Sequence, residues 1–436
     1  MHNILCYIIH MNNDEILINT TEEEPERVVV AVVDSGEYDV ESSLGEMRAL
    51  CETAGAVVVG EIVQRREHAD NASYLGMGKL EETKRLCEAL DADLVVADAE
   101  LTGVKQRNME NAVGVDVIDR TTLILDIFAH SAKTAEGKLQ VELAQLNYRL
   151  PRLTGAGVSL SRIGGSASGG SGGKIGTRGP GETKLENDKR YIRNRISLLK
   201  DRLREIEKQR EVTRKNRDKT GTPVVSLVGY TNVGKSSLLN ALTGSSVLSE
   251  DKLFATLDPT ARKLSVGDLQ QVILVDTVGF VSRLPHNLVE AFKSTLEEIK
   301  YSDLIIKVLD ASSETWQEQD KITADIIEQL ECVDVPTITV FNKCDKIDTG
   351  AALPGLAVSA KTGKGLDLLV SQISKKLSER VIRCVVKLPF DKLSLTAFIR
   401  ERGNVISEEY VEDGAIIKAT IERAAYAKIE PYVIGI

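Results

Sequence analysis

The first part of the chain alternates short, β-branched apolar runs with longer segments that have helical periodicity. The apolar runs lie at 27–34, 55–63, 92–98 and 115–119. Buried strands that are joined by amphipathic crossover helices produce this alternation. The pattern therefore predicts a parallel α/β domain, which we assign to residues 1–128.

Two amphipathic helices follow, separated by a segment rich in glycine and serine. One face of the first helix carries Leu139, Leu143, Leu146 and Leu150, and one face of the second carries Ile192, Ile196, Leu199, Leu203 and Ile206. Spacings of four and three residues are typical of an antiparallel helical pair or a short coiled coil. Because glycine and serine bury little apolar area, we expect 155–182 to form the tip loop of a long α-helical hairpin at 129–220.

A second α/β pattern begins near residue 221. Its apolar runs lie at 224–228, 272–276, 303–310, 336–342 and 356–359, with helical segments between them. We assign a doubly wound α/β domain to residues 221–380. The remaining residues, 381–436, show a strand, a helix near 392–400 and two more strands, which predicts a small α+β domain. The fold class is therefore multidomain α/β.

The composition is that of a soluble globular protein, with 42% apolar and 28% charged residues in a chain of 436. Its six cysteines have no paired spacing, which indicates reduced thiols and predicts a cytoplasmic location. The apolar start of the chain is too short to span a bilayer, so we expect no obligate membrane partner, with partial membrane association left open. No sequence feature indicates a DNA partner or an obligate dimer, and we expect a monomer.

Charge is distributed unevenly along the chain. The net charge of −10 alone argues weakly against a nucleic-acid partner. Residues 182–219, however, hold 14 Lys and Arg against 8 Asp and Glu. Such a segment either contacts nucleic-acid phosphates or is a solvated helix face, and composition leaves both interpretations open.

The segment GYTNVGKS matches G-x-x-x-x-G-K-[ST] directly after a predicted strand and at the start of a predicted helix. We expect its backbone N–H groups to surround nucleotide phosphates. Lys235 would reach the β- and γ-phosphates, and Ser236 would ligate Mg²⁺. The predicted phosphate-binding residues are Gly229, Tyr230, Thr231, Asn232, Val233, Gly234, Lys235 and Ser236.

Two further segments are expected at the triphosphate. DTVG, which comprises Asp276, Thr277, Val278 and Gly279, would supply Asp276 to Mg²⁺ and the Gly279 N–H to the γ-phosphate. FATLD, which comprises Phe254, Ala255, Thr256, Leu257 and Asp258, would supply the Thr256 hydroxyl to Mg²⁺. The predicted metal ligands are thus Ser236, Thr256 and Asp276, and the predicted catalytic residues are Lys235, Thr256 and Gly279.

The residue after DTVG is Phe280, where many small GTPases have a glutamine that orients the attacking water. A phenyl ring has no hydrogen-bonding group for this task. We therefore predict slow intrinsic hydrolysis, completed by a residue or surface from elsewhere that a partner supplies.

A motif further along selects the base. NKCD follows a predicted strand, and the Asp345 carboxylate can accept hydrogen bonds from guanine N1–H and the exocyclic amine, which adenine does not offer in that arrangement. Asn342 can bond the guanine edge, and the Lys343 stem can cover the ring. The backbone of SAK, which comprises Ser359, Ala360 and Lys361, can donate to guanine O6. The predicted substrate and product are therefore GTP and GDP.

Three segments outside the nucleotide motifs narrow the interpretation. GTRGPGETKLENDKR at 176–190, YLGMGKLEE at 74–82 and LFATLDPT at 253–260 resemble the HflX family of ribosome-associated GTPases, and the resemblance covers nearly the whole chain. The segment SASGGSGGK looks longer and richer in glycine than the sequence that usually precedes GTRGPGETKLENDKR in the family. The resemblance implies a GTPase that binds the large ribosomal subunit when GTP-loaded and takes part in splitting or rescuing stalled ribosomes under stress.

The resemblance also implies contacts with rRNA and allows a second nucleotide. The candidate rRNA-contacting residues are Arg162, Lys174, Arg178, Lys184, Lys189, Arg190 and Arg193, each of which is otherwise a solvated surface residue. GMGK at 76–79 is a weak signal for ATP in the N-terminal domain and is more typical of the turn at a helix start.

A different class of function fits the same GTP site. The chain could be a regulatory binding protein whose GTP state controls attachment to a non-ribosomal protein partner. Salt separates the two hypotheses, because binding to rRNA weakens steeply with added salt and an apolar protein interface does not.

Overall fold

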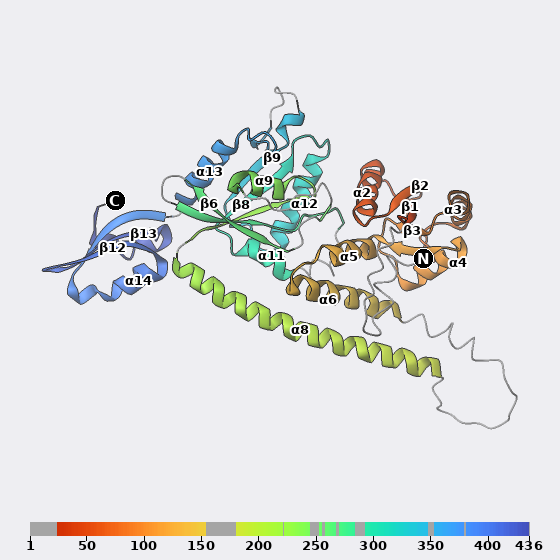
Figure 1. The fold of residues 1–436 in the computed structure, drawn as a ribbon, viewed down its shortest axis with the longest axis horizontal. Coiled ribbons are helices and arrows are strands. Elements are labelled where there is room, and N and C mark those ends of the chain that lie inside the picture. Colours follow the sequence, from red (N-terminus) through yellow and green to blue (C-terminus); the bar gives the residue numbers. More distant parts are fainter. Residues whose placement is uncertain are drawn as a thin grey trace. The chain divides into compact units, whose positions relative to one another are not determined.

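The computed structural model describes residues 24–153, 180–220, 222–244, 253–254, 258–266, 270–283, 293–347, 353–378 and 381–435. These residues form two compact units (Figure 1). Unit 1 holds the described residues up to Leu203, together with Leu253, Phe254 and Arg283, and unit 2 holds the others. Within these ranges, no helix combines the length and the apolar character needed to cross a membrane.

Unit 1 is built on a parallel sheet with the strand order β2-β1-β3-β4. The strands are β1 (Arg27–Asp34), β2 (Val57–Arg65), β3 (Leu94–Ala97) and β4 (Asp116–Asp119). The helices around it are α2 (Val40–Thr53), α3 (Met77–Leu90), α4 (Gly103–Val113) and α5 (Arg120–Ser131). Residues 28–32 of β1 are fully buried, as expected for a strand covered on both faces. From β1 the chain adds β2 on one side, and it then adds β3 and β4 on the other side. The strand order therefore reverses between β1 and β3, and ligands are expected at the carboxyl ends of these two strands.

A pair of packed helices completes unit 1. Leu143 and Leu146 of α6 (Ala135–Arg152) form an apolar cluster with Ile192 and Leu199 of α8 (Pro180–Thr220). This is the contact that the leucine and isoleucine spacing predicts. Helix α8 begins at Pro180, within the segment predicted as the tip loop, because proline is well suited to the first position of a helix.

The nucleotide-binding part of unit 2 has a six-stranded mixed sheet with the order β10-β9-β8-β5-β7-β6. Its strands are β5 (Val224–Gly229), β6 (Thr260–Val266), β7 (Gln270–Asp276), β8 (Leu304–Asp310), β9 (Thr337–Asn342) and β10 (Leu356–Ala357). Its helices are α9 (Lys235–Thr243), α11 (Lys293–Lys300), α12 (Trp316–Gln329), the 3₁₀ turn η2 (Cys344–Lys346) and α13 (Leu366–Ser378). Strand β6 runs antiparallel to β7 and the remaining pairs are parallel, so the phosphate loop after β5 lies at the carboxyl edge of a largely parallel sheet.

The last part of unit 2 is an antiparallel sheet with the order β12-β13-β11-β14. Its elements are β11 (Val381–Leu388), η3 (Phe390–Lys392), α14 (Ser394–Arg402), β12 (Gly403–Val411), β13 (Gly414–Glu422), α15 (Arg423–Tyr426), η4 (Glu430–Tyr432) and β14 (Val433–Gly435). Its own apolar cluster joins β11 and β13 to Ile399 of α14. The strand, helix and two strands predicted here are present, with β14 as an addition.

The sequence patterns did not predict two elements of the fold. Helix α5 is almost entirely buried, so it lacks the polar face that marks an amphipathic helix. Strand β6 lies at the sheet edge and buries only Leu264 and Val266, so its sequence has no continuous apolar run.

Candidate functional site

The phosphate loop connects β5 to α9 and requires glycine at two positions. A Cβ on Gly229 would lie 2.2 Å from the Val308 carbonyl oxygen. Gly234 has a φ of +86°, and a Cβ there would lie 2.5 Å from Nδ2 of Asn342. Only glycine meets both conditions without strain. The backbone can therefore curl tightly enough for its N–H groups to surround a phosphate.

Lys235 is buried at the start of α9. Its Nζ donates to the carbonyl oxygens of Tyr230, at 2.8 Å, and Gly229, at 3.1 Å. Burial lowers the pKa of Lys235 to about 8, and the Asp276 carboxylate partly opposes this shift. A phosphate beside Nζ favours the charged form of the amine, so binding of a triphosphate raises this pKa again.

Ser236 and Asp276 form the predicted metal-binding pair. The Ser236 hydroxyl donates to Oδ2 of Asp276 at 2.6 Å, and Asp276 is fully buried at the end of β7. Mg²⁺ is commonly bound through one or two carboxylates together with substrate phosphates, and this hydroxyl and carboxylate fit that role. Thr256, the third predicted ligand, lies outside the described residues, as do Ala255 and Leu257.

The DTVG segment is fixed against the phosphate loop by backbone hydrogen bonds. Phe280 N–H donates to the Gly229 carbonyl at 3.1 Å, and Thr231 N–H donates to the Phe280 carbonyl at 2.7 Å. Thr277 and Val278 are both buried. The Phe280 side chain is only 2% exposed and belongs to an apolar cluster of unit 2. Phe280 therefore serves the core, which agrees with its inability to orient water.

Asn342 joins the phosphate loop to the base-reading segment. Its Nδ2 donates to the Val233 carbonyl at 2.9 Å, and its Oδ1 accepts from Ala360 N–H at 3.0 Å. We expected this amide to bond the guanine edge. In the structure both ends of the amide also bond to the protein, so Asn342 braces the two segments, and its bond to the guanine edge stays a prediction.

The remaining base-reading residues lie at the same edge of the sheet. Lys343 Nζ donates to the Asn232 carbonyl at 2.6 Å and pairs with Asp310 at 2.8 Å, which holds its stem beside the loop. Oδ1 of Asp345 accepts from the Ser359 hydroxyl at 2.6 Å, and this bond lowers the pKa of Asp345. The carboxylate is thus charged at neutral pH and can accept from two guanine N–H groups. Lys361 follows in the same segment and is exposed.

Phe254, which was predicted at the triphosphate, is described as part of unit 1. Phe254 is 3% exposed, and its ring packs edge-on against Phe128 of unit 1, with ring centroids 4.5 Å apart. Its aromatic side chain is therefore used for packing. Asp258, at the other end of the FATLD segment, is described next to the start of β6.

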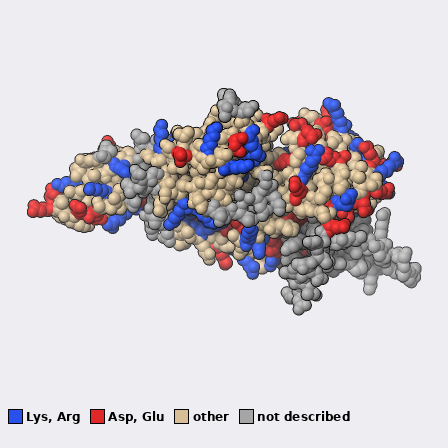
Figure 2. All heavy atoms as spheres, turned by 45° about the horizontal axis from the view of Figure 1, so that its top comes forward, with Lys and Arg blue, Asp and Glu red and all other residues tan. Residues whose placement is uncertain are grey.

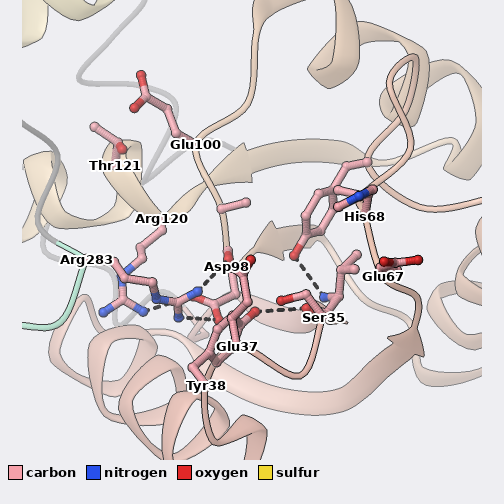
Figure 3. Close-up of a pocket in the computed structure, with 14 residues that line it drawn as sticks. Ser35, Glu37, Tyr38, Glu67, His68, Asp98, Glu100, Arg120, Thr121 and Arg283 are labelled. Carbon is pink, nitrogen blue, oxygen red and sulfur yellow. Dashed lines mark hydrogen bonds and ion pairs between the residues drawn. The ribbon is translucent and has the colours of Figure 1, made fainter. Parts of the chain in front are cut away.

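Unit 1 contains a crevice of about 450 Å³ at the carboxyl edge of its sheet (Figure 3). Asp98 follows β3 and is buried, and Arg120 pairs with it at 2.9 Å. Arg283 bonds the other carboxylate oxygen at 2.7 Å, and its guanidinium lies 4.2 Å from the ring centre of Tyr38. The sequence patterns did not indicate this cluster. Charged residues that directly follow buried strands were the signal that could have indicated it.

The weak ATP motif in unit 1 forms the start of a helix. Gly76 is the N-cap residue of α3, and its N–H donates to Oε1 of Gln64 at 2.9 Å. Nζ of Lys79 bonds both carboxylate oxygens of Glu82, at 2.8 and 2.9 Å. The lysine that would contact a phosphate is thus paired within the helix.

Family models match four successive parts of the chain. Their descriptions are "GTP-binding GTPase N-terminal" for 41–129, "GTP-binding GTPase Middle Region" for 131–217, "50S ribosome-binding GTPase" for 224–343 and "HflX C-terminal domain" for 348–428.

Individual proteins are similar over most of their length. The GTPase HflX of Caldanaerobacter subterraneus subsp. tengcongensis is 46% identical, over 94% of this chain and 95% of that protein. The GTPase HflX of Escherichia coli is 39% identical, over 89% of this chain and 91% of that protein. Among solved structures, the SsGBP–GDP complex is 25% identical, with 81% of this chain and 99% of that chain covered and a TM-score of 0.46.

Proposed function

This chain belongs to the HflX family of GTPases, and from that premise we propose that it is a Mg²⁺-dependent enzyme that acts on ribosomes. In this proposal the GTP-bound protein binds the large ribosomal subunit, the ribosome stimulates hydrolysis, and the cycle splits or rescues stalled ribosomes under stress. The description of the model that matches 224–343 supports this partner.

The nucleotide site carries the enzymatic part of the proposal. A glycine-shaped loop, the buried amine of Lys235 and the Ser236–Asp276 pair lie at one edge of the sheet. Bound Mg²⁺ would neutralise charge on the phosphates. Lys235 would bind the phosphates, Gly279 N–H would contact the γ-phosphate, and Asp345 would select guanine. These residues would bind and orient GTP. Phe280 would supply no hydrogen-bonding group to the attacking water.

Helix α8 supports an rRNA contact. Arg193, Lys200 and Arg204 are exposed and recur at spacings of seven and four residues, which places them on one face of the helix. Two other arginines of α8 are held by internal carboxylates: Arg195 bonds Glu142 at 2.6 Å, and Arg214 stacks on a tyrosine near Glu298. Arg193 also lies 3.9 Å from Glu186, but this pair is exposed, so the face that carries Arg193 and Lys200 remains accessible to phosphates.

The described face that Figure 2 shows is not strongly basic. Figure 2 shows Lys and Arg interspersed with Asp and Glu on the face turned toward the viewer. An rRNA contact would therefore be local. Of the other rRNA candidates, Lys189 and Arg190 also lie on α8 and Lys184 at its start, while Arg162, Lys174 and Arg178 lie outside the described residues.

Sedimentation with large ribosomal subunits tests the partner. Arg193→Gln combined with Lys200→Gln should weaken binding of the protein, loaded with a non-hydrolysable GTP analogue, and should reduce the salt slope by roughly 0.7–0.9 per lost phosphate contact. Arg202→Gln is the matched control, because this exposed arginine lies two residues from Lys200 on the opposite side of α8. Binding that does not depend on salt or on these residues would favour the alternative function, a GTP-controlled protein that binds a non-ribosomal protein.

The remaining parts of the proposal concern location, assembly and a second nucleotide. We propose a cytoplasmic monomer, with any membrane association being partial. We do not extend the proposal to ATP, because Lys79 is paired with Glu82. Binding of fluorescent ATP to the full chain, compared with Lys79→Ala, would overturn this choice if ATP bound and the variant released it.

A further inference from the structure

We propose that the Thr231 hydroxyl orients the attacking water in GTP hydrolysis. Phe280 cannot do so, because its ring lies in the core. A group from the chain itself would then supply the slow intrinsic reaction, before any partner is bound. Three observations support this role: the place of Thr231 in the phosphate loop, the state of its hydroxyl, and the partners that the neighbouring hydroxyls already have.

Thr231 lies at the γ-phosphate end of the loop. A Cβ on Gly279 would lie 2.8 Å from both Cα and Cγ2 of Thr231, and 3.0 Å from Nζ of Lys235. Gly279 N–H and Lys235 Nζ are the two groups expected at the γ-phosphate. Because Cα and the methyl carbon of Thr231 contact the same small space, we infer that its side chain borders the expected position of the γ-phosphate and its attacking water.

The Thr231 hydroxyl is buried and has no hydrogen-bond partner among the described residues. The residue is only 5% exposed. A buried hydroxyl without a partner costs free energy, and this cost is recovered when a water or phosphate oxygen binds it. The hydrogen bond between Thr231 N–H and the Phe280 carbonyl fixes the backbone of Thr231. The hydroxyl is therefore held on a rigid support.

Neighbouring hydroxyls already have partners. The Tyr230 hydroxyl accepts from Ser282 N–H at 2.7 Å, the Ser236 hydroxyl donates to Asp276 at 2.6 Å, and the Thr277 hydroxyl donates to the Leu227 carbonyl at 2.7 Å. Thr231 thus differs from these three residues in having both its donor and its acceptor available.

The proposed step needs no ionisation of threonine. The hydroxyl oxygen accepts a hydrogen bond from the water and aligns it with the γ-phosphorus. The water oxygen then bonds to phosphorus as the bond to the β–γ bridging oxygen breaks, and the electron pair remains on GDP. One water proton passes to an oxygen of the transferred phosphoryl group and leaves with inorganic phosphate. Thr231 is regenerated without loss or gain of a proton.

Two substitutions separate the hydroxyl from the methyl group of Thr231. Thr231→Val keeps the branched shape and removes the hydroxyl, whereas Thr231→Ser keeps the hydroxyl and removes the methyl group. We measure single-turnover GTP hydrolysis by the full chain without ribosomes, and GDP affinity by fluorescence titration. Thr231→Val should hydrolyse GTP about 10-fold more slowly or worse, equivalent to ~1.4 kcal/mol. Thr231→Ser should stay within about 3-fold, and GDP affinity should change little in both variants.

Either of two results for the hydrolysis rates of these variants would overturn the proposal. If Thr231→Val hydrolyses GTP like the unmodified protein, or if Thr231→Ser loses as much activity, the residue acts only through packing against Gly279. Circular dichroism confirms folding, and Thr231→Ala replaces the valine variant if that protein does not fold. Because no ribosome is present, failure here leaves the proposed ribosomal function untouched.

Discussion

Replacing Arg120 by methionine should lower the free energy of unfolding of unit 1. The loss should be larger than the loss of any exposed ion pair would cause. The Arg120 side chain is 3% exposed and pairs with Asp98 at 2.9 Å and Glu46 at 2.8 Å. Removal of one partner from a buried pair typically costs about 3–5 kcal/mol. Arg283 and the Ser43 hydroxyl would still contact Asp98, so we expect the lower end, about 3 kcal/mol.

Hydrogen exchange of the full chain measures this loss locally. Two-state denaturation is not assured for a chain of two units, whereas the amides of β3 report the opening of unit 1 directly. Protection in β3 should fall on the order of 100-fold in Arg120→Met. The control is Arg48→Met, because Arg48 is 44% exposed and pairs with Glu61 at the surface, where a pair contributes about 1 kcal/mol or less. Equal, small changes in both variants would refute the reasoning.

Three further predictions concern single positions. Gly234→Ala should abolish measurable GTP binding in a fluorescence titration, since the left-handed backbone and the nearby Asn342 amide leave no room for a Cβ, and near-normal affinity would contradict the loop geometry. GTP affinity should be highest below pH 8 and fall by up to about tenfold per pH unit above it, because the pKa of Lys235 is about 8 in the free protein and the phosphates need the charged amine; a flat profile from pH 7 to 9.5 would argue against this. Burial raises the pKa of Asp126 to about 8, so the folded state holds a proton that the unfolded state releases, and stability falls as pH rises toward 8. Asp126→Asn should therefore raise the hydrogen-exchange protection of β3, with a gain that widens from pH 5 to pH 8, and a gain that shrinks over this range would oppose the assignment.

Much of the fold followed from periodicity. The apolar runs predicted β1 with its observed bounds, because a strand covered by helices on both faces is apolar throughout. Helix α5 could not be predicted in the same way, since burial on nearly all sides removes the periodic signal. Strand β6 escaped notice for the opposite reason, because most of its side chains are exposed.

The nucleotide site could be predicted from the sequence because its chemistry requires particular residues at fixed spacings. A loop that surrounds phosphates needs glycine and lysine at set intervals, so Gly234 and Lys235 could be placed without a structure. The use made of Asn342 could not, since its two hydrogen bonds join segments far apart in sequence. The crevice around Asp98 was missed for the same reason, because it combines residues that follow four strands with Arg283.

The central claim is that this GTPase acts on ribosomes. Its most direct test is steady-state GTP hydrolysis by the full chain, with and without large ribosomal subunits, at low and moderate salt. A variant with 155–182 replaced by a plain linker is measured beside it. The account predicts strong stimulation by subunits that weakens with salt and is lost in the shortened variant. Hydrolysis that is unchanged by subunits at either salt concentration would contradict the ribosomal function and leave only the GTP site.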